Sequence, residues 1–228
     1  MATKNEIKRL SRSVRDDIKF FLSHNTHIFS CEAEFQLLLA RFLQNSPNNY
    51  DKVFVEYYVP KSELKPYEWD QDMNIDIVVK KDCKFVPVEL KYKTKEVFKE
   101  YHCFNQELKD IEILRNQSAI NIGTYDFWKD VRRLEILANN FQDIVDGFAV
   151  LLTNDGLYLE KRGANCHSVE MSTDPGMHDK SRHWGEGSTY INSKSRPSFD
   201  LDNWYDVKWK KCVINEEIFH YCIINLIK

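Results

Sequence analysis

Glycine and proline are scarce in this chain, with 7 and 6 copies among 228 residues. Hydrophobic residues make up 43% and aromatic residues 13% of the chain, and this composition excludes collagen-like, low-complexity and wholly disordered proteins. A globule of this length buries about 70% of the surface that its unfolded chain exposes. We therefore expect a single domain over residues 1–228 that folds without disulfides or a structural metal.

Long apolar runs and paired cysteines are also lacking. The sequence has no run of 18 or more apolar residues that could span a membrane, and its first residues lack the apolar centre of a signal peptide. The six cysteines are scattered without a Cys-x-x-Cys pair, as is typical of reduced thiols. These features predict a cytoplasmic protein.

Neither sign of charge is in large excess, because 32 Lys and Arg face 35 Asp and Glu, for a net charge of −3. This balance argues against a basic coat that binds nucleic acid everywhere on the surface. The charges are nevertheless unevenly placed. Residues 80–99 carry seven lysines against three acids, a local charge of +4, whereas residues 51–76 carry seven acids against three lysines. Any attraction for a nucleic acid has to be local.

The hydrophobic pattern predicts helices on either side of a sheet. Apolar residues at three- and four-residue steps predict helices over residues 1–22, after the N-cap Ser30, and over residues 124–137. Runs of β-branched and aromatic residues predict strands at 53–59, 74–79, 85–93, 147–153, 157–160 and 218–227. The short segment 80–84 joins the second and third strands in a hairpin. The expected fold class is α/β (α+β), with a central mixed sheet flanked by helices.

Two segments do not fit this pattern. Residues 94–122 are highly charged, and the sequence assigns them no element. Residues 163–197 lose apolar periodicity and form a long loop, which in a compact domain is typical of a lid, a binding loop or a disordered segment.

Charged residues interrupt the two strands of the predicted hairpin. Asp76 lies within an otherwise apolar run, and on the next strand Glu89 and Lys91 are two residues apart, so that both point to the same face. Buried charges persist when they are paired or when they hold a metal, and carboxylates on adjacent strands suit a hard divalent cation. The alternative is a half-exposed hairpin with a cross-strand ion pair. We favour the metal site.

Asp76, followed thirteen residues later by Glu89-Leu90-Lys91, resembles the motif of the PD-(D/E)XK nuclease superfamily, the fold of many restriction endonucleases. The chain departs from that motif at Ile75, where the family's pattern has proline. The resemblance implies a restriction endonuclease-like core and a Mg²⁺ or Mn²⁺ ion held by Asp76, Glu89 and the backbone carbonyl of Leu90. Lys91 would be the catalytic lysine.

In this superfamily, a helix before the core sheet commonly donates an acidic residue to the same site. The helix after Ser30 offers Glu32 and Glu34. Glu34 is preferred as the catalytic acid, because it shares a helical stripe with apolar residues that face the sheet. Glu32, close to the start of the helix, is more simply explained by its favourable interaction with the helix dipole.

Four further residues are candidate accessory groups. Lys93 shares a strand face with Lys91, and Gln117 and Tyr125 are loosely similar to the Gln and Tyr that follow the catalytic lysine in RecB-like nucleases. Arg133 could contact a phosphate, or it could pair with Asp130 three residues before it.

The resemblance, which extends to uncharacterised bacterial members of the superfamily, implies Mg²⁺-dependent hydrolysis of DNA by an endonuclease-like enzyme in restriction, phage defence or DNA repair. The other readings are a catalytically inactive binding or regulatory protein with the nuclease fold, and a nuclease directed at RNA. DNA is the expected partner, while a homodimer and an RNA or protein partner stay open.

Overall fold

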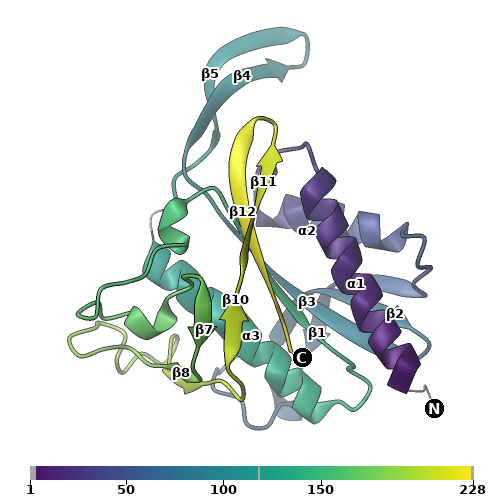
Figure 1. Ribbon diagram of the computed structural model, residues 1–228, viewed down its shortest axis with the longest axis vertical. Helices are drawn as coiled ribbons and strands as arrows, with labels where there is room; N and C mark the ends of the chain where they lie inside the picture. Colours follow the sequence, from purple (N-terminus) through teal and green to yellow (C-terminus); the bar gives the residue numbers. More distant parts are fainter. Residues whose placement is uncertain (1–3, 118, 227–228) are drawn as a thin grey trace.

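The computed structural model describes residues 4–117 and 119–226, and a mixed sheet runs through the centre of this part of the chain (Figure 1). The six strands of this sheet in the described residues lie in the order β1-β2-β3-β6-β12-β11. Only β3 and β6 pair in parallel, and the other neighbours are antiparallel. The bounds are β1 (Lys52–Val59), β2 (Met73–Lys81), β3 (Lys84–Lys93), β6 (Phe148–Thr153), β11 (Trp209–Ile214) and β12 (Glu217–Asn225). The mixed α/β class and the predicted β2–β3 hairpin are confirmed.

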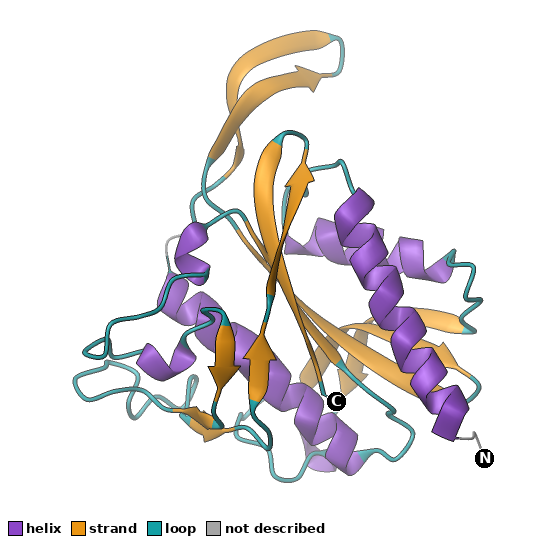
Figure 2. Cartoon of the chain, viewed as in Figure 1, coloured by secondary structure: helices purple, strands orange, loops and turns teal. Residues whose placement is uncertain are grey.

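Helices cover both faces of the sheet (Figure 2). The helices α1 (Lys4–His24) and α2 (Glu32–Gln44) pack on one face, and α3 (Ile120–Asn140) packs on the other. Each face buries its own apolar cluster, as expected of a sheet that is covered on both sides. The three predicted helices are confirmed, although residues 1–3 of the predicted helix 1–22 lie outside the described part. No helix in that part is long and apolar enough to cross a membrane.

The N-cap of α2 is Cys31 rather than the predicted Ser30. Cys31 has an extended backbone, and its side chain makes no capping hydrogen bond. Instead, Glu34 reaches back, and its Oε2 accepts the backbone N–H of Ser30 at 2.6 Å. This contact is similar to the returning bond of a capping box, so a side chain inside the helix replaces the predicted Ser30 cap.

The returning strand predicted at 157–160 is wrong. β6 is paired with β3 on one edge and with β12 on the other, so it has no free edge for a further strand. The chain instead makes a short 3-10 turn, η2 (Gly156–Tyr158), in which the Asp155 carboxylate accepts the N–H of Leu157 at 3.0 Å. The final strand was predicted to reach residue 227, which lies outside the described part.

The unassigned segment 94–122 contains a hairpin that projects away from the sheet, formed by β4 (Val97–Cys103) and β5 (Gln106–Leu114) (Figure 1). Its base is anchored by the buried side chains of Val97 and Leu114, whereas Phe104 at its tip is 98% exposed. Because most of the hairpin packs on no core, its sequence shows alternation of apolar and polar residues only near its base, at Ile111 and Ile113.

The long loop predicted at 163–197 packs on the outer side of α3. It contains the short 3-10 helix η3 (Val169–Met171) and two short strands, β7 (Gly176–His178) and β8 (Ser181–Arg182). β7 pairs with β10 (Tyr205–Val207), and β8 pairs with β9 (Phe199–Asp200). Within it, the carbonyl of Ser172 accepts the indole N–H of Trp128 at 3.0 Å, and Trp184 stacks on Tyr125 with ring centroids 5.3 Å apart. The loop therefore covers α3. The remaining short element, η1 (Lys61–Glu63), follows β1.

The hairpin base and tip should differ sharply in their effect on stability. Leu114→Ala should lower the free energy of unfolding by about 2–4 kcal/mol, because it leaves a cavity in the core. Phe104→Ala, at the exposed tip, should change it by less than about 0.5 kcal/mol. Urea denaturation measures both variants, and equal losses would show that the hairpin packs along its length.

Candidate functional site

The candidate site forms where β2 and β3 separate. Their pairing ends at Ile77 and Val88, although β2 stays paired with β1 as far as Met73. Beyond Val88, the ladder of β3 continues only with β6, through Lys93. Buried backbone N–H groups need an acceptor, so the freed edge of β3 has to find acceptors other than a strand.

Side chains supply these acceptors. Oδ2 of Asp76 accepts the N–H of Leu90 at 2.6 Å, and Oε2 of Glu32 accepts the N–H of Tyr92 at 2.7 Å. On the side of β2, the amide of Gln36 donates to the carbonyl oxygen of Asp76 at 2.8 Å. The carboxylates of Asp76 and Glu32 are therefore held at the edge of the sheet, because they accept the backbone hydrogen bonds that a neighbouring strand would otherwise accept.

Lys91 lies among these carboxylates. Its Nζ is 2.7 Å from Oδ2 of Asp130 on α3 and 3.6 Å from Oε1 of Glu32 on α2, and it donates to the carbonyl oxygen of Leu90 at 2.9 Å. Burial alone would lower the pKa of Lys91, but the surrounding carboxylates, Asp130 first and Glu32 next, raise it above its usual range. The side chain is therefore a fixed ammonium group.

Arg133 is the second cation of the site. Its Nη1 lies 3.2 Å from Oε1 of Glu89 and 3.1 Å from Oδ1 of Asp130, and its Nη2 donates to the carbonyl oxygen of Asn74. Glu89 is 1% exposed, and its Oε1 accepts no hydrogen bond despite the nearby guanidinium. Burial raises the pKa of Glu89 well above its usual range, although Arg133 pulls it down.

Asp76 is also perturbed. Burial raises its pKa to about 6, against the attraction of Lys91. Its backbone N–H lies 3.5 Å from Oε2 of Glu89, so the two carboxylates come from facing positions of the separating strands. Carboxyl groups with raised pKa values in a cluster of charges are frequent at functional sites.

The cluster carries an excess of negative charge. Among the described residues, the carboxylates of Glu32, Asp76, Glu89 and Asp130 face the two cations Lys91 and Arg133. The carboxyl groups therefore outnumber the cations by two, and burial raises the pKa values of Asp76 and Glu89, which lowers their negative charge while no further cation is bound. No group of three or more His, Cys, Asp or Glu side chains in the described part of the chain is arranged to hold a metal by itself. An ion between Asp76 and Glu89 would need further oxygen ligands from backbone, water or substrate.

Most of the residues predicted for the site are brought together, but Glu34 lies apart. Asp76, Glu89 and Lys91 meet with the carbonyl of Leu90 in the cluster. Oε1 of Glu34 lies 2.9 Å from Nε2 of His27, and its other oxygen binds the Ser30 N–H. Residues two apart on a helix point in nearly opposite directions, so Glu32 occupies the place beside Lys91 for which Glu34 was preferred.

The candidate accessory residues are divided in the same way. Arg133 belongs to the cluster, where it makes the Asp130 ion pair that was one of its two readings. Lys93 follows on the same strand face, partly buried. The side chain of Gln117 is exposed, whereas Tyr125 is fully buried and donates its hydroxyl to the carbonyl of Pro197 at 2.9 Å. Tyr125 is therefore a packing residue of the layer outside α3.

Asp130 contacts both cations, yet the sequence suggested it only as a partner of Arg133. A usable signal was present: Asp126, Lys129, Asp130 and Arg133 recur at helical spacing in a helix that is otherwise mostly apolar on its buried sides. Charged residues on the helix face that packs on a sheet are expected to pair with residues of opposite charge on that sheet, as Asp130 does with Lys91.

No family model, no curated protein and no solved structure matches this chain. Its function therefore has to be inferred from the site itself.

Removing Arg133 should test how strongly the buried charges are coupled. Arg133→Met leaves Glu89 without its cation and should lower the free energy of unfolding by about 3–5 kcal/mol. Adding Glu89→Gln removes one buried charge, so the double variant should recover part of this loss, with a coupling energy of about 1–3 kcal/mol.

The cycle is measured by urea denaturation in the presence of EDTA. Arg9→Met, an exposed position on α1, is the control and should change stability by less than about 0.5 kcal/mol. Additive effects of the two cluster substitutions would contradict the arrangement described here.

Proposed function

We propose that this protein is a metal-dependent nuclease of the PD-(D/E)XK type, which hydrolyses phosphodiester bonds of DNA with a Mg²⁺ or Mn²⁺ ion at Asp76 and Glu89. The observation that carries this proposal is the cluster at the opened edge of the sheet, in which four carboxyl groups, with Glu89 and Asp130 fully buried, face only two cations. Desolvated carboxylates are costly unless a cation compensates them. A divalent ion between Asp76 and Glu89 would favour the ionised form of both carboxyl groups.

The available ligands suit such an ion. Mg²⁺ is commonly bound through one or two carboxylates and keeps several waters, so Asp76, Glu89 and the Leu90 carbonyl are a sufficient protein contribution. Oε1 of Glu89 is buried and accepts no hydrogen bond, and a metal would bind it in place of its 3.2 Å contact with Nη1 of Arg133. The Leu90 carbonyl accepts one hydrogen bond from Lys91 and has a second lone pair.

The arrangement of the elements also supports a restriction endonuclease-like core. The mixed sheet lies between helices, and the helix that precedes β1 brings an acidic residue, Glu32, to the cluster. These are the features that the resemblance of the sequence implies, and they connect the charged motif to a helix remote from it in the chain.

Lys91 has an electrostatic role in this proposal. Because its pKa is raised above the usual range, it cannot accept a proton from water near neutral pH. Its ammonium group would instead position the attacking water and stabilise the negative charge that develops on the phosphoryl group. Asp130 and Glu32 hold the ammonium in place at 2.7 and 3.6 Å.

A bound metal would lower the pKa of a coordinated water and neutralise charge on the phosphate. The chain's own contribution is orientation: Leu90 N–H fixes Asp76, and Arg133 fixes Asp130, which in turn holds Lys91. Water would attack the phosphorus in line and lose a proton to the surrounding water, while the bond from phosphorus to the 3′-oxygen breaks and that oxygen takes up a proton from water.

The ion pair between Arg133 and Glu89 favours a second candidate, a non-catalytic binding or regulatory protein. With Nη1 3.2 Å from Oε1, the guanidinium partly compensates the charge that the nuclease reading assigns to the metal. If Glu89 keeps this pair at saturating metal, the cluster is structural and the second candidate is correct.

Cleavage assays test the proposal directly. With Mg²⁺ or Mn²⁺, the wild-type protein should cleave plasmid or single-stranded DNA, and Asp76→Asn, Glu89→Gln and Lys91→Met should each lose at least about a hundredfold in rate. Glu100→Gln, an exposed carboxylate on the projecting hairpin, is the control and should keep full activity.

Thermal unfolding should show that each variant is folded. A protein that leaves both DNA forms intact across titrations of the two metals would contradict the proposal. Cleavage of RNA but not of DNA would show that the substrate of the nuclease is RNA.

A further inference from the structure

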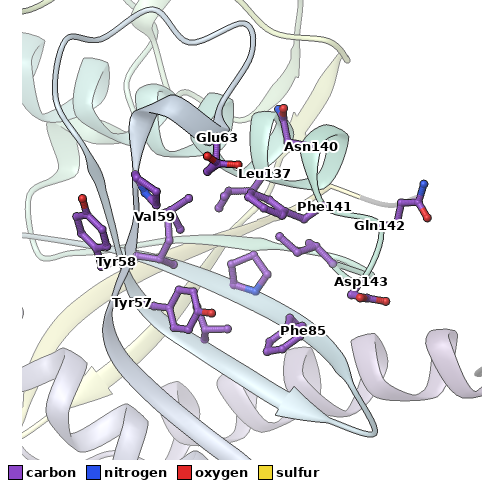
Figure 3. Close-up of a pocket in the computed structure, with 15 residues that line it drawn as sticks. Tyr57, Tyr58, Val59, Glu63, Phe85, Leu137, Asn140, Phe141, Gln142 and Asp143 are labelled. Atoms are coloured by element: carbon purple, nitrogen blue, oxygen red, sulfur yellow. The ribbon is translucent and has the colours of Figure 1, made fainter.

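A pocket of about 420 Å³ lies between the sheet and the end of α3 (Figure 3). Ile75, which lines it, directly precedes Asp76, and Pro87 comes two residues before Glu89 on the same strand face. Two residues along a strand span about 7 Å. Leu137, on α3, also lines the pocket and follows Arg133 by about one turn. The pocket and the cluster therefore share three elements.

The walls of the pocket are aromatic and apolar. Tyr57, Phe85 and Phe141 present their rings around one space, from β1, from the start of β3 and from the end of α3 (Figure 3). Its volume lies in the range of small-ligand sites, which are lined mainly by such side chains. The polar lining residues are Glu63, Asn140, Gln142 and Asp143. Among the described residues that line the pocket there is no Lys, Arg or His, so it suits an uncharged planar group rather than a phosphate.

The pocket is held in shape by hydrogen bonds of its own walls. Phe85 donates its N–H to the carbonyl of Asp143 at 2.9 Å, and its carbonyl accepts the N–H of Val145 at 3.0 Å. Asn140 exchanges hydrogen bonds of 3.2 Å with the backbone of Lys65, which ties the segment after β1 to α3. A pocket built in this way exists before a ligand binds, so binding does not require its walls to be ordered first.

We infer that this pocket receives one unpaired nucleobase of a DNA strand whose phosphodiester lies at Asp76 and Glu89. The inference rests on the proposed nuclease function and names its substrate class. Every base has a planar apolar face that stacks on aromatic side chains whatever the sequence. The charged phosphate belongs at the cluster, and the uncharged base belongs in the adjacent pocket.

This placement has a consequence for the substrate. Bases of an intact duplex are stacked and paired, so they reach a pocket only from a single strand or after extrusion from the helix. The preferred substrate is therefore single-stranded DNA, or a duplex with an unpaired nucleotide at the cleavage point.

Binding of two oligonucleotides tests the pocket separately from catalysis. A labelled twelve-residue deoxyadenosine strand and a strand of twelve abasic residues carry the same phosphates, and EDTA prevents cleavage during fluorescence anisotropy measurements. The wild-type protein should bind the deoxyadenosine strand about tenfold more tightly, the effect typical of one base stacked on an aromatic side chain.

Phe141→Ala should abolish this tenfold preference and leave the affinity for the abasic strand unchanged. Tyr57→Ala, in the opposite wall, is the second variant if Phe141→Ala fails to fold. Phe104→Ala removes an exposed aromatic residue on the projecting hairpin and is the matched control, which should keep the preference.

Equal wild-type affinities for the two strands, or a preference that both pocket variants retain, would overturn the inference. If the protein nevertheless cleaves DNA with Mg²⁺, the nuclease proposal stands and only the pocket assignment falls. A base preference that the pocket variants remove, together with no cleavage under any metal, supports the pocket and overturns the nuclease proposal.

Discussion

The hydrogen bond from the backbone of Leu90 to the carboxylate of Asp76 is the contact on which the site depends. It allows β2 and β3 to separate without leaving a buried N–H group unsatisfied, and Glu32 does the same for Tyr92. A carboxylate that takes the place of a strand is held at the edge of the sheet, where Asp76 is partly buried and Glu32 is still partly exposed. The cations Lys91 and Arg133 offset part of the cost of desolvation, and Asp130 fixes both of them. The raised pKa values of Asp76 and Glu89 and the fixed ammonium group of Lys91 follow from this opening of the sheet.

The same opening explains how distant parts of the chain act together. α2 approaches the freed edge of β3 with its first turn, so its acid reaches the cluster, while α3 brings its charged stripe to the opposite side. Where the strands remain paired, beyond Val78 and Pro87, the same face of the sheet becomes apolar and forms the floor of the neighbouring pocket. A charged region and an apolar region thus share one face of the sheet.

Much of this arrangement could be predicted from the sequence. Most strands and helices of the core follow hydrophobic periodicity, but the edge strand β11 was not predicted. Asp76 and Glu89 stand out in the sequence because charged residues are unusual within apolar strands. The β4–β5 hairpin could not be found in this way, since it buries little beyond Val97 and Leu114. The choice between Glu32 and Glu34 depended on how the first turn of α2 meets β3, which no periodicity specifies. The sequence predicts a strand at 157–160 in place of the turn after β6, because it does not show that both edges of β6 are already paired with β3 and β12.

The most direct test of this account is the position of a metal ion. Crystals soaked in Mn²⁺ should show an anomalous peak between Asp76 and Glu89, at about 2.1 Å from a carboxylate oxygen of each, the distance typical of a small octahedral cation. The peak should be accompanied by a longer separation between Arg133 and Glu89. A structure at saturating Mn²⁺ with no peak at this position, and with the ion pair between Arg133 and Glu89 intact, would contradict the account.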